Sequence, residues 1–191
     1  MFRNVICSKM SSTTQKAVIL SYPGATAGGL LNKLKNDPKF KNINPSHISQ
    51  FVIFCGNNNV DNILKIPASL QSEFVHGYHI DDNRLHLSLN ELTKLTEFLH
   101  SWTATAKVNV LPRQSTIRNI VINNINHHIK QLSIDKDYVE IVSTEKHRSL
   151  FSINGYRKNM YFLNSSTDNV HLNNTGLARL TKYLKYFIHH N

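Results

Sequence analysis

Short apolar runs alternate along this chain with longer segments in which apolar residues recur at helical spacing. Apolar runs bounded by turn residues predict β-strands, and segments with a helical period predict the helices that connect them. We expect strands at residues 4–6, 17–21, 51–55, 107–111 and 138–142. Three of these runs, at 4–6, 17–21 and 51–55, contain an uninterrupted apolar stretch instead of an alternating pattern, which is typical of strands covered by helices on both faces. The alternation therefore predicts an α/β fold, with three α/β/α layers around a mostly parallel, flavodoxin-like, five-stranded sheet.

The helical pattern predicts helices over residues 26–36, 88–102, 115–132 and 175–190. Two of these segments place a complete apolar stripe on one face, which predicts core positions. The stripes comprise Leu92, Leu95, Leu99 and Trp102 in the second segment, and Ile117, Val121, Ile125, Ile129 and Leu132 in the third. The chain has 191 residues and shows neither an internal repeat nor a linker, so we expect one domain over residues 1–191.

The chain is strongly basic, with 22 Lys and Arg against 12 Asp and Glu and a formal net charge of +10. Such a balance favours nucleic acid or another polyanion as a partner. No run of Lys and Arg, aromatic RNA-binding motif or zinc-finger spacing is present. The alternative is that the lysines are scattered over solvated outer faces of helices.

The cysteines and the lengths of the apolar runs indicate the cellular compartment. Cys7 and Cys55 each follow an apolar run and do not make a disulfide framework, which favours a reducing compartment. The N-terminal sequence lacks an apolar segment of signal-peptide length, and no run is long enough for a transmembrane segment. We therefore expect an intracellular, cytoplasmic protein.

Polar and glycine-containing segments follow two of the predicted strands, where open α/β sheets bind their ligands. The first is PGAT at residues 23–26, in which the N–H of Gly24 at a helix start is a candidate hydrogen-bond donor. The second is GNNN at residues 56–59, whose carboxamides are neutral donors suited to a developing oxyanion. For both segments the alternative is a plain turn.

A carboxylate and an imidazole lie close together before the last predicted helix. Asp168 precedes His171 by three residues in DNVHLNNTG. At this spacing a carboxylate can orient the ring and stabilise its protonated form, as in a catalytic triad. The alternative is that Asp168 caps a turn and His171 is a polar residue beside Leu172.

In this order, PGAT, GNNN and DNVHLNNTG resemble the sequence blocks of the SGNH, or GDSL-type, hydrolase family. In particular, the chain resembles esterase-like proteins associated with retroelements and viruses of animals, over nearly its whole length. The resemblance implies an ester hydrolase that needs no metal or cofactor.

The resemblance also implies a role for each matching residue. Gly24 would be the backbone oxyanion donor and Asn58 the side-chain donor. Asp168 would orient His171, and His171 would be the general base. Asn59 stands where the family has an aspartate.

The family's nucleophile block, Gly-Asp-Ser, is absent from the sequence. Strict superposition of the first strand places Lys9 at the serine position, and Ser8 lies one residue earlier. Ser8 is therefore the candidate nucleophile, with Ser11, Ser12 or the thiol of Cys7 as alternatives.

Two hypotheses follow. In the first, the chain is a serine esterase that hydrolyses an acyl or acetyl ester with Ser8, His171 and Asp168. In the second, it is a catalytically degenerate relative with a structural or particle-binding role in a virus or mobile element, and its charge binds nucleic acid. A nucleotide-binding flavodoxin-like protein is disfavoured, because neither a glycine-rich phosphate fingerprint nor a P-loop is present.

Overall fold

The computed structural model describes residues 18–55, 57–65, 79–102, 106–109, 116–141, 159–161 and 172–190. The chain divides into two compact units. One comprises Gly24–Ile141, and the other comprises Met1–Pro23 together with Val142–Asn191. The single domain expected from the sequence remains a prediction.

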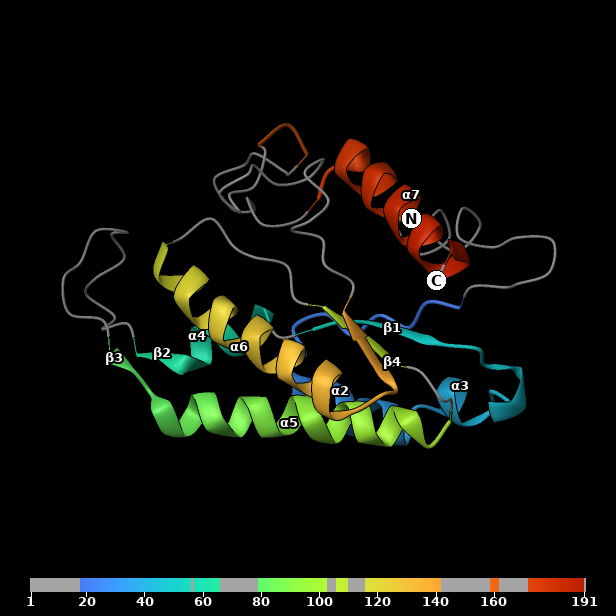
Figure 1. Ribbon diagram of the computed structural model, residues 1–191, viewed down its shortest axis with the longest axis horizontal. Helices are drawn as coiled ribbons and strands as arrows, with labels where there is room; N and C mark the ends of the chain where they lie inside the picture. The colour runs from blue at the N-terminus through green and yellow to red at the C-terminus, as the bar shows by residue number, and fades with distance from the viewer. Residues whose placement is uncertain are drawn as a thin grey trace. The chain divides into compact units, whose positions relative to one another are not determined.

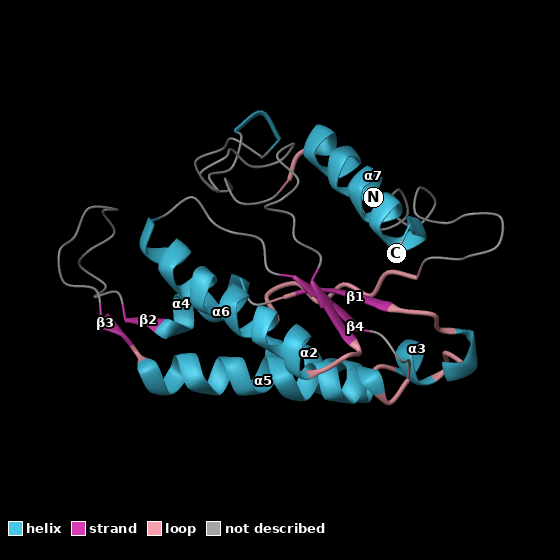
Figure 2. Ribbon diagram, viewed as in Figure 1, coloured by secondary structure: helices cyan, strands magenta, loops and turns pink. Residues whose placement is uncertain are grey.

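The Gly24–Ile141 unit contains a three-stranded parallel sheet (Figure 2). Its strands are β1 (Phe51–Phe54), β4 (Ala106–Asn109) and β5 (Val139–Ile141), in the order β1-β4-β5. Phe51 pairs with Ala106, and Ala106 pairs with Val139. A separate antiparallel pair joins β2 (Leu64–Lys65) to β3 (His79–Ile80).

The expected three-layer α/β/α fold around a flavodoxin-like, five-stranded sheet is wrong: the described residues are mostly helical (68%) and place three strands in the parallel sheet. Residues 4–6 lie outside the described part. Residues 18–21 are described and form no strand, and the Val18 side chain is 61% exposed. An apolar run favours a strand only where it meets cross-strand and same-face neighbours, so composition alone misidentified this segment.

Helices make up most of the other described residues of the Gly24–Ile141 unit (Figure 1). They are α2 (Ala27–Asn36), α3 (Pro38–Lys41), the 3₁₀-helix η1 (Pro45–His47), α4 (Asn57–Ile63), α5 (Asp82–His100) and α6 (Thr116–Asp135). Side-chain oxygens cap the starts of α2, α3 and α5, where Thr26, Asp37 and Asp81 accept from backbone N–H groups. Helix α2 packs against α5, and α5 and α6 lie side by side and contact β4.

The predicted apolar stripes lie in the core of this unit. Leu92, Leu95 and Leu99 of α5 and the matching positions of α6 from Val121 to Leu132 are buried, as predicted. Trp102 is only half-buried, and the side chain of Ile117 lies outside the described part. The helical period of the sequence therefore identified the buried faces of α5 and α6 correctly.

An aromatic cluster closes one end of the core. The ring of Phe40, from α3, is 1% exposed. Its centroid lies 4.7 Å from that of Trp102, 5.9 Å from Phe98 and 6.1 Å from Phe51. Helix α3 has only four residues and is too short to be stable without tertiary packing. The buried Phe40 side chain supplies that packing.

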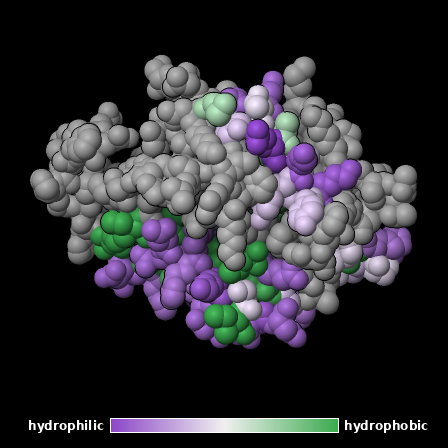
Figure 3. Space-filling view, turned by 45° about the horizontal axis from the view of Figure 1, so that its top comes forward, coloured by the Kyte–Doolittle hydropathy of each residue, from purple (hydrophilic) through white to green (hydrophobic). Residues whose placement is uncertain are grey.

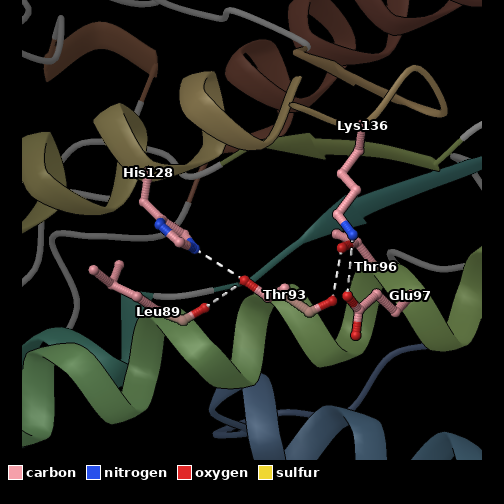
Figure 4. Close-up of polar contacts among 6 residues, drawn as sticks. All are labelled: Leu89, Thr93, Thr96, Glu97, His128 and Lys136. Atoms are coloured by element: carbon pink, nitrogen blue, oxygen red, sulfur yellow. Dashed lines mark hydrogen bonds and ion pairs between the residues drawn. The ribbon is translucent and has the colours of Figure 1, made fainter. Parts of the chain in front are cut away.

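A polar contact between α5 and α6 involves His128 (Figure 4). The Thr93 hydroxyl donates to the Leu89 carbonyl at 3.2 Å, and its oxygen is hydrogen-bonded to His128 Nε2 at 3.0 Å, with a direction that depends on the histidine tautomer. Burial lowers the pKa of His128, and the nearby His127 and His86 lower it further, against the opposing effect of a backbone hydrogen bond at Leu89. The neutral form of His128 is therefore the one that the fold favours.

Acidification should destabilise the protein through His128. The pKa of His128 in the folded state lies below the ordinary value of about 6.5. The stability that depends on neutral His128 is therefore complete above about pH 6.5. It is lost as the pH falls from there toward the folded-state pKa, because the unfolded chain then binds the proton more readily. Urea unfolding at several pH values between about 5 and 7 measures it. His128→Gln should flatten the loss, and the control His47→Gln, at an exposed position, should not. An equally steep loss in His128→Gln would contradict the prediction.

The other unit contains η2 (Asn159–Tyr161) and α7 (Asn174–His190). Asn173 caps α7, since its Oδ1 accepts from the Gly176 N–H at 2.9 Å. The Asn173 Nδ2 and backbone N–H donate to the carbonyls of Met160 and Tyr161, at 2.8 and 3.0 Å. The helix start is therefore tied to η2. None of the helices in the described ranges is both long and apolar enough to cross a membrane.

Candidate functional site

Gly24 lies in a turn directly before α2. Its φ angle is +73°, which side chains other than glycine rarely adopt. A Cβ at this position would meet nothing within 4 Å, so the glycine is required by its backbone conformation and not by close packing. Proline followed by a glycine of positive φ is the signature of a type II turn.

The N–H groups of the first turn of α2 are bound by protein acceptors. Ala27 donates to Oδ1 of Asn59 at 3.0 Å, and Gly28 donates to Oε2 of Glu91 at 3.1 Å. Gly29 donates to Oγ1 of Thr26 at 3.1 Å. These three groups satisfy most of the donors that a helix start leaves unpaired. These three N–H groups are therefore not available to a ligand. Gly24 lies before them in the sequence and is not among the donors bound in this way.

Asn59 connects three helices. It belongs to α4 and is 3% exposed. Its Oδ1 accepts from Ala27 of α2, and its Nδ2 donates to Oγ of Ser88 on α5 at 3.0 Å. A neutral carboxamide supplies both an acceptor and a donor, and it avoids a second carboxylate beside that of Glu91 at the same helix start.

Asn58 lies in the first turn of α4, next to Asn59. Only its backbone is described. The Asn59–Ala27 hydrogen bond joins residues 32 positions apart and brings the segment after Gly24 into contact with the start of α4. The structure thus brings together the segments that contain two of the five predicted site residues, Gly24 and Asn58.

The other three predicted residues, Ser8, Asp168 and His171, lie outside the described part of the chain, as do Cys7, Ser11 and Ser12. The residues that follow His171 are described from Leu172 onward, and Asn173 there caps α7. A Cβ on Gly176 would collide with the Tyr161 carbonyl oxygen. The second half of DNVHLNNTG therefore has a structural role at the start of α7.

Sequence reasoning missed Ser88 and Glu91 as partners of the α2 start. Both lie on α5 at a spacing of three residues, on the face that also carries Leu92 and Leu95. Polar residues on an otherwise apolar helix face predict hydrogen bonds to another element, because a buried polar group needs a partner.

The described side chains contain no thiolate nucleophile at neutral pH. Burial raises the pKa of the Cys55 thiol to about 12. This thiol follows β1 and stays protonated, so it is a poor nucleophile and a poor metal ligand. Within the described ranges no group of three or more His, Cys, Asp or Glu residues is arranged to hold a metal ion.

In comparisons with known proteins, no family model, no curated protein and no solved structure matches this chain. The likeness to SGNH hydrolases therefore remains a hypothesis that depends on the three sequence blocks. The geometry around Gly24, Asn58 and Asn59 is the structural observation that bears on it.

Proposed function

We propose that this chain hydrolyses an acyl or acetyl ester. The observation that supports this best is the Asn59–Ala27 hydrogen bond, which holds the segment after Gly24 against the start of α4, where Asn58 lies. These are the two segments expected to supply oxyanion donors. Ser8, His171 and Asp168 keep the roles that the sequence pattern gives them.

The proposed reaction proceeds through an acyl-enzyme. The Ser8 oxygen attacks the acyl carbon while His171 takes the hydroxyl proton, and Asp168 orients the imidazole. The Gly24 N–H and the Asn58 carboxamide stabilise the negative charge on the tetrahedral oxygen. His171 then returns the proton to the leaving alcohol, and water releases the acid by the reverse sequence of steps.

Preorganisation is the physical argument for the two oxyanion donors. Donors contribute most when they are fixed before the charge develops, because no reorganisation is then needed. The turn at Gly24 is fixed by its φ angle and by the hydrogen-bonded helix start that follows it. The backbone at Asn58 belongs to the helix that Asn59 ties to α2 and α5.

Hydrolysis of p-nitrophenyl acetate and butyrate by the full chain tests the proposal. Ser8→Ala and His171→Ala should each lower kcat by roughly 10³-fold or more. Asn58→Ala should lower kcat by about 10²- to 10³-fold, with a smaller effect on KM. Ser11→Ala and Ser12→Ala are controls for the nucleophile, and Asn62→Ala, at an exposed position of the same helix, is the control for Asn58.

The controls should retain wild-type rates. An unchanged rate in Ser8→Ala, together with a loss in Ser11→Ala, Ser12→Ala or Cys7→Ala, would overturn the assignment of the nucleophile. A folded wild-type chain that does not exceed the rate of the His171→Ala variant would overturn the proposed activity.

A further inference from the structure

Helix α7 exposes three basic side chains and one aromatic side chain on a single face. Arg179, Lys182 and Tyr186 follow one another at intervals of three and four residues, which places them in one row along the helix. Lys185 lies three residues after Lys182, beside this row. All four side chains are exposed, and that of Tyr186 is 63% exposed. We call these four residues the α7 basic face.

The burial pattern of α7 agrees with the helical spacing. An α-helix turns by about 100° per residue, so the four residues of the α7 basic face fall within an arc of about 120°. Leu180 and Leu184 come from the opposite side of the helix and are buried, with 8% and 4% of their surface exposed. The α7 basic face is therefore the solvent side of an amphipathic helix.

No carboxylate on α7 balances this charge. Residues 174–190 contain neither Asp nor Glu. No ion pair among the described residues involves Arg179, Lys182 or Lys185. Arg179 contacts an aromatic ring, with its guanidinium carbon 5.1 Å from the centroid of Tyr161. A cation–π contact leaves the guanidinium charged, so all three residues contribute positive charge to the surface.

Helix stabilisation alone does not account for these cations. A basic side chain is stabilised by the helix dipole when it lies in the last turn of the helix. Helix α7 ends at His190, so Arg179 and Lys182 lie near its middle. Their positions therefore have no explanation in the dipole of their own helix.

The composition of the α7 basic face indicates which polyanion it fits. Tyr186 is the one large hydrophobic residue that α7 exposes among its described side chains. Cations beside an exposed aromatic ring suit single-stranded nucleic acid, because the charges follow the phosphates and the ring stacks on a base. A duplex offers phosphates to the same cations, but its bases are already stacked on one another.

A membrane surface fits α7 less well. A membrane-binding helix inserts several apolar side chains, whereas Leu180 and Leu184 of α7 are buried within the protein. The hydrophobic residues that show on the described surface in Figure 3 form separate groups among hydrophilic ones.

We propose that the α7 basic face binds single-stranded nucleic acid without sequence preference. Arg179, Lys182 and Lys185 contact phosphates, and the Tyr186 ring stacks on a base. This interaction is independent of the proposed ester hydrolysis, because none of the four residues belongs to the proposed catalytic residues.

Fluorescence anisotropy with the full chain tests this proposal. The probes are two unstructured RNA strands of unrelated sequence and a duplex of one of them, titrated between about 50 and 200 mM KCl. Both single strands should bind with similar affinity, and the duplex should bind more weakly. Each phosphate contact on a single strand contributes about −0.7 to the slope of log K against log salt. Three contacts therefore contribute about −2.1, or a roughly 20-fold loss over this range.

Removal of two of the charges tests the phosphate contacts. Lys182→Gln/Lys185→Gln should bind single strands at least about 10-fold more weakly at the lower salt concentration, with a slope shallower by about 1.4. The matched control Lys94→Gln/Lys130→Gln removes the same charge from exposed positions of α5 and α6 and should keep the wild-type slope. Arg179 is left unchanged because it packs on Tyr161. Circular dichroism should show both variants folded.

Replacement of the exposed tyrosine tests the stacking contact. Tyr186→Ala should weaken single-strand binding at least about 5-fold without changing the salt slope, because it removes a stacking surface and no charge. Tyr186→Phe keeps the aromatic ring and should bind like the wild type. Neither substitution should change the affinity for the duplex.

Four results would overturn the proposal. They are the absence of wild-type binding to single strands at the lower salt concentration, an equal loss in Lys182→Gln/Lys185→Gln and its control, and wild-type affinity in Tyr186→Ala. The fourth is binding to vesicles of phosphatidylserine and phosphatidylcholine without binding to nucleic acid. Ester hydrolysis by all of these variants should equal that of the wild type, so failure of this proposal is distinguishable from failure of the proposed function.

Discussion

Phe40→Ala is expected to lower the free energy of unfolding by about 3–5 kcal/mol, the usual cost of removing a buried aromatic side chain. Phe40 is 1% exposed and contacts three aromatic rings from two other segments of its unit, β1 and the C-terminal end of α5. Its loss opens a cavity between Phe51, Phe98 and Trp102 that rigid strands and helices refill only in part. Urea unfolding, with midpoints compared at a constant m-value, measures the change.

Two variants serve as controls for Phe40→Ala. Phe40→Leu keeps most of the apolar volume and should cost clearly less. Ile134→Ala removes an apolar side chain that is 68% exposed and should change stability by less than about 0.5 kcal/mol. A Phe40→Ala variant as stable as Ile134→Ala would show that the aromatic cluster is not part of the core.

Asn59→Ala is expected to cost about 2–4 kcal/mol. It removes two hydrogen bonds and leaves the Ala27 N–H and the Ser88 hydroxyl without their partners. Each buried polar group left without a partner costs about 1–3 kcal/mol. The same urea measurement applies, with Asn62→Ala, at an exposed position of α4, as the matched control.

A double-mutant cycle tests the Asn59 contact directly. Asn59→Ala and Ser88→Ala should be non-additive by at least about 0.5 kcal/mol, because the two side chains share one hydrogen bond. Asn59→Asp should be less stable at pH 7 than at pH 5, since a second carboxylate beside Glu91 disfavours ionisation. Additive effects in the cycle would show that the contact does not stabilise the fold.

The parts of the fold that the sequence predicted are those determined by local patterns. The runs at 51–55, 107–111 and 138–142 contain β1, β4 and β5, and the apolar stripes identified the buried faces of α5 and α6. The run at 17–21 has the same apolar character but forms no strand, because strand formation depends on a partner that local composition does not specify. The helix at Asn57–Ile63 was missed, because an Asn-rich segment favours turns by propensity.

In the candidate site, the sequence predicted local structure only where a single residue determines the backbone conformation. Gly24 after Pro23 indicated a turn, and the positive φ confirms it. The hydrogen bonds of Asn59 and Glu91 to the start of α2 join residues 32 and 63 positions apart. Such contacts follow from tertiary packing and have no local sequence signal. Asn59 therefore seemed to be a departure from a motif, whereas the structure gives it a structural role that needs a neutral side chain.

Labelling with a fluorophosphonate, followed by mass spectrometry of the intact chain and its peptides, tests the proposed hydrolase most directly. An activated serine attacks the phosphorus and releases fluoride, so the adduct identifies the nucleophile. The proposed mechanism predicts one adduct, on Ser8, that is absent from His171→Ala. No adduct on the folded wild-type chain, or an adduct on another residue that persists in His171→Ala, would contradict it.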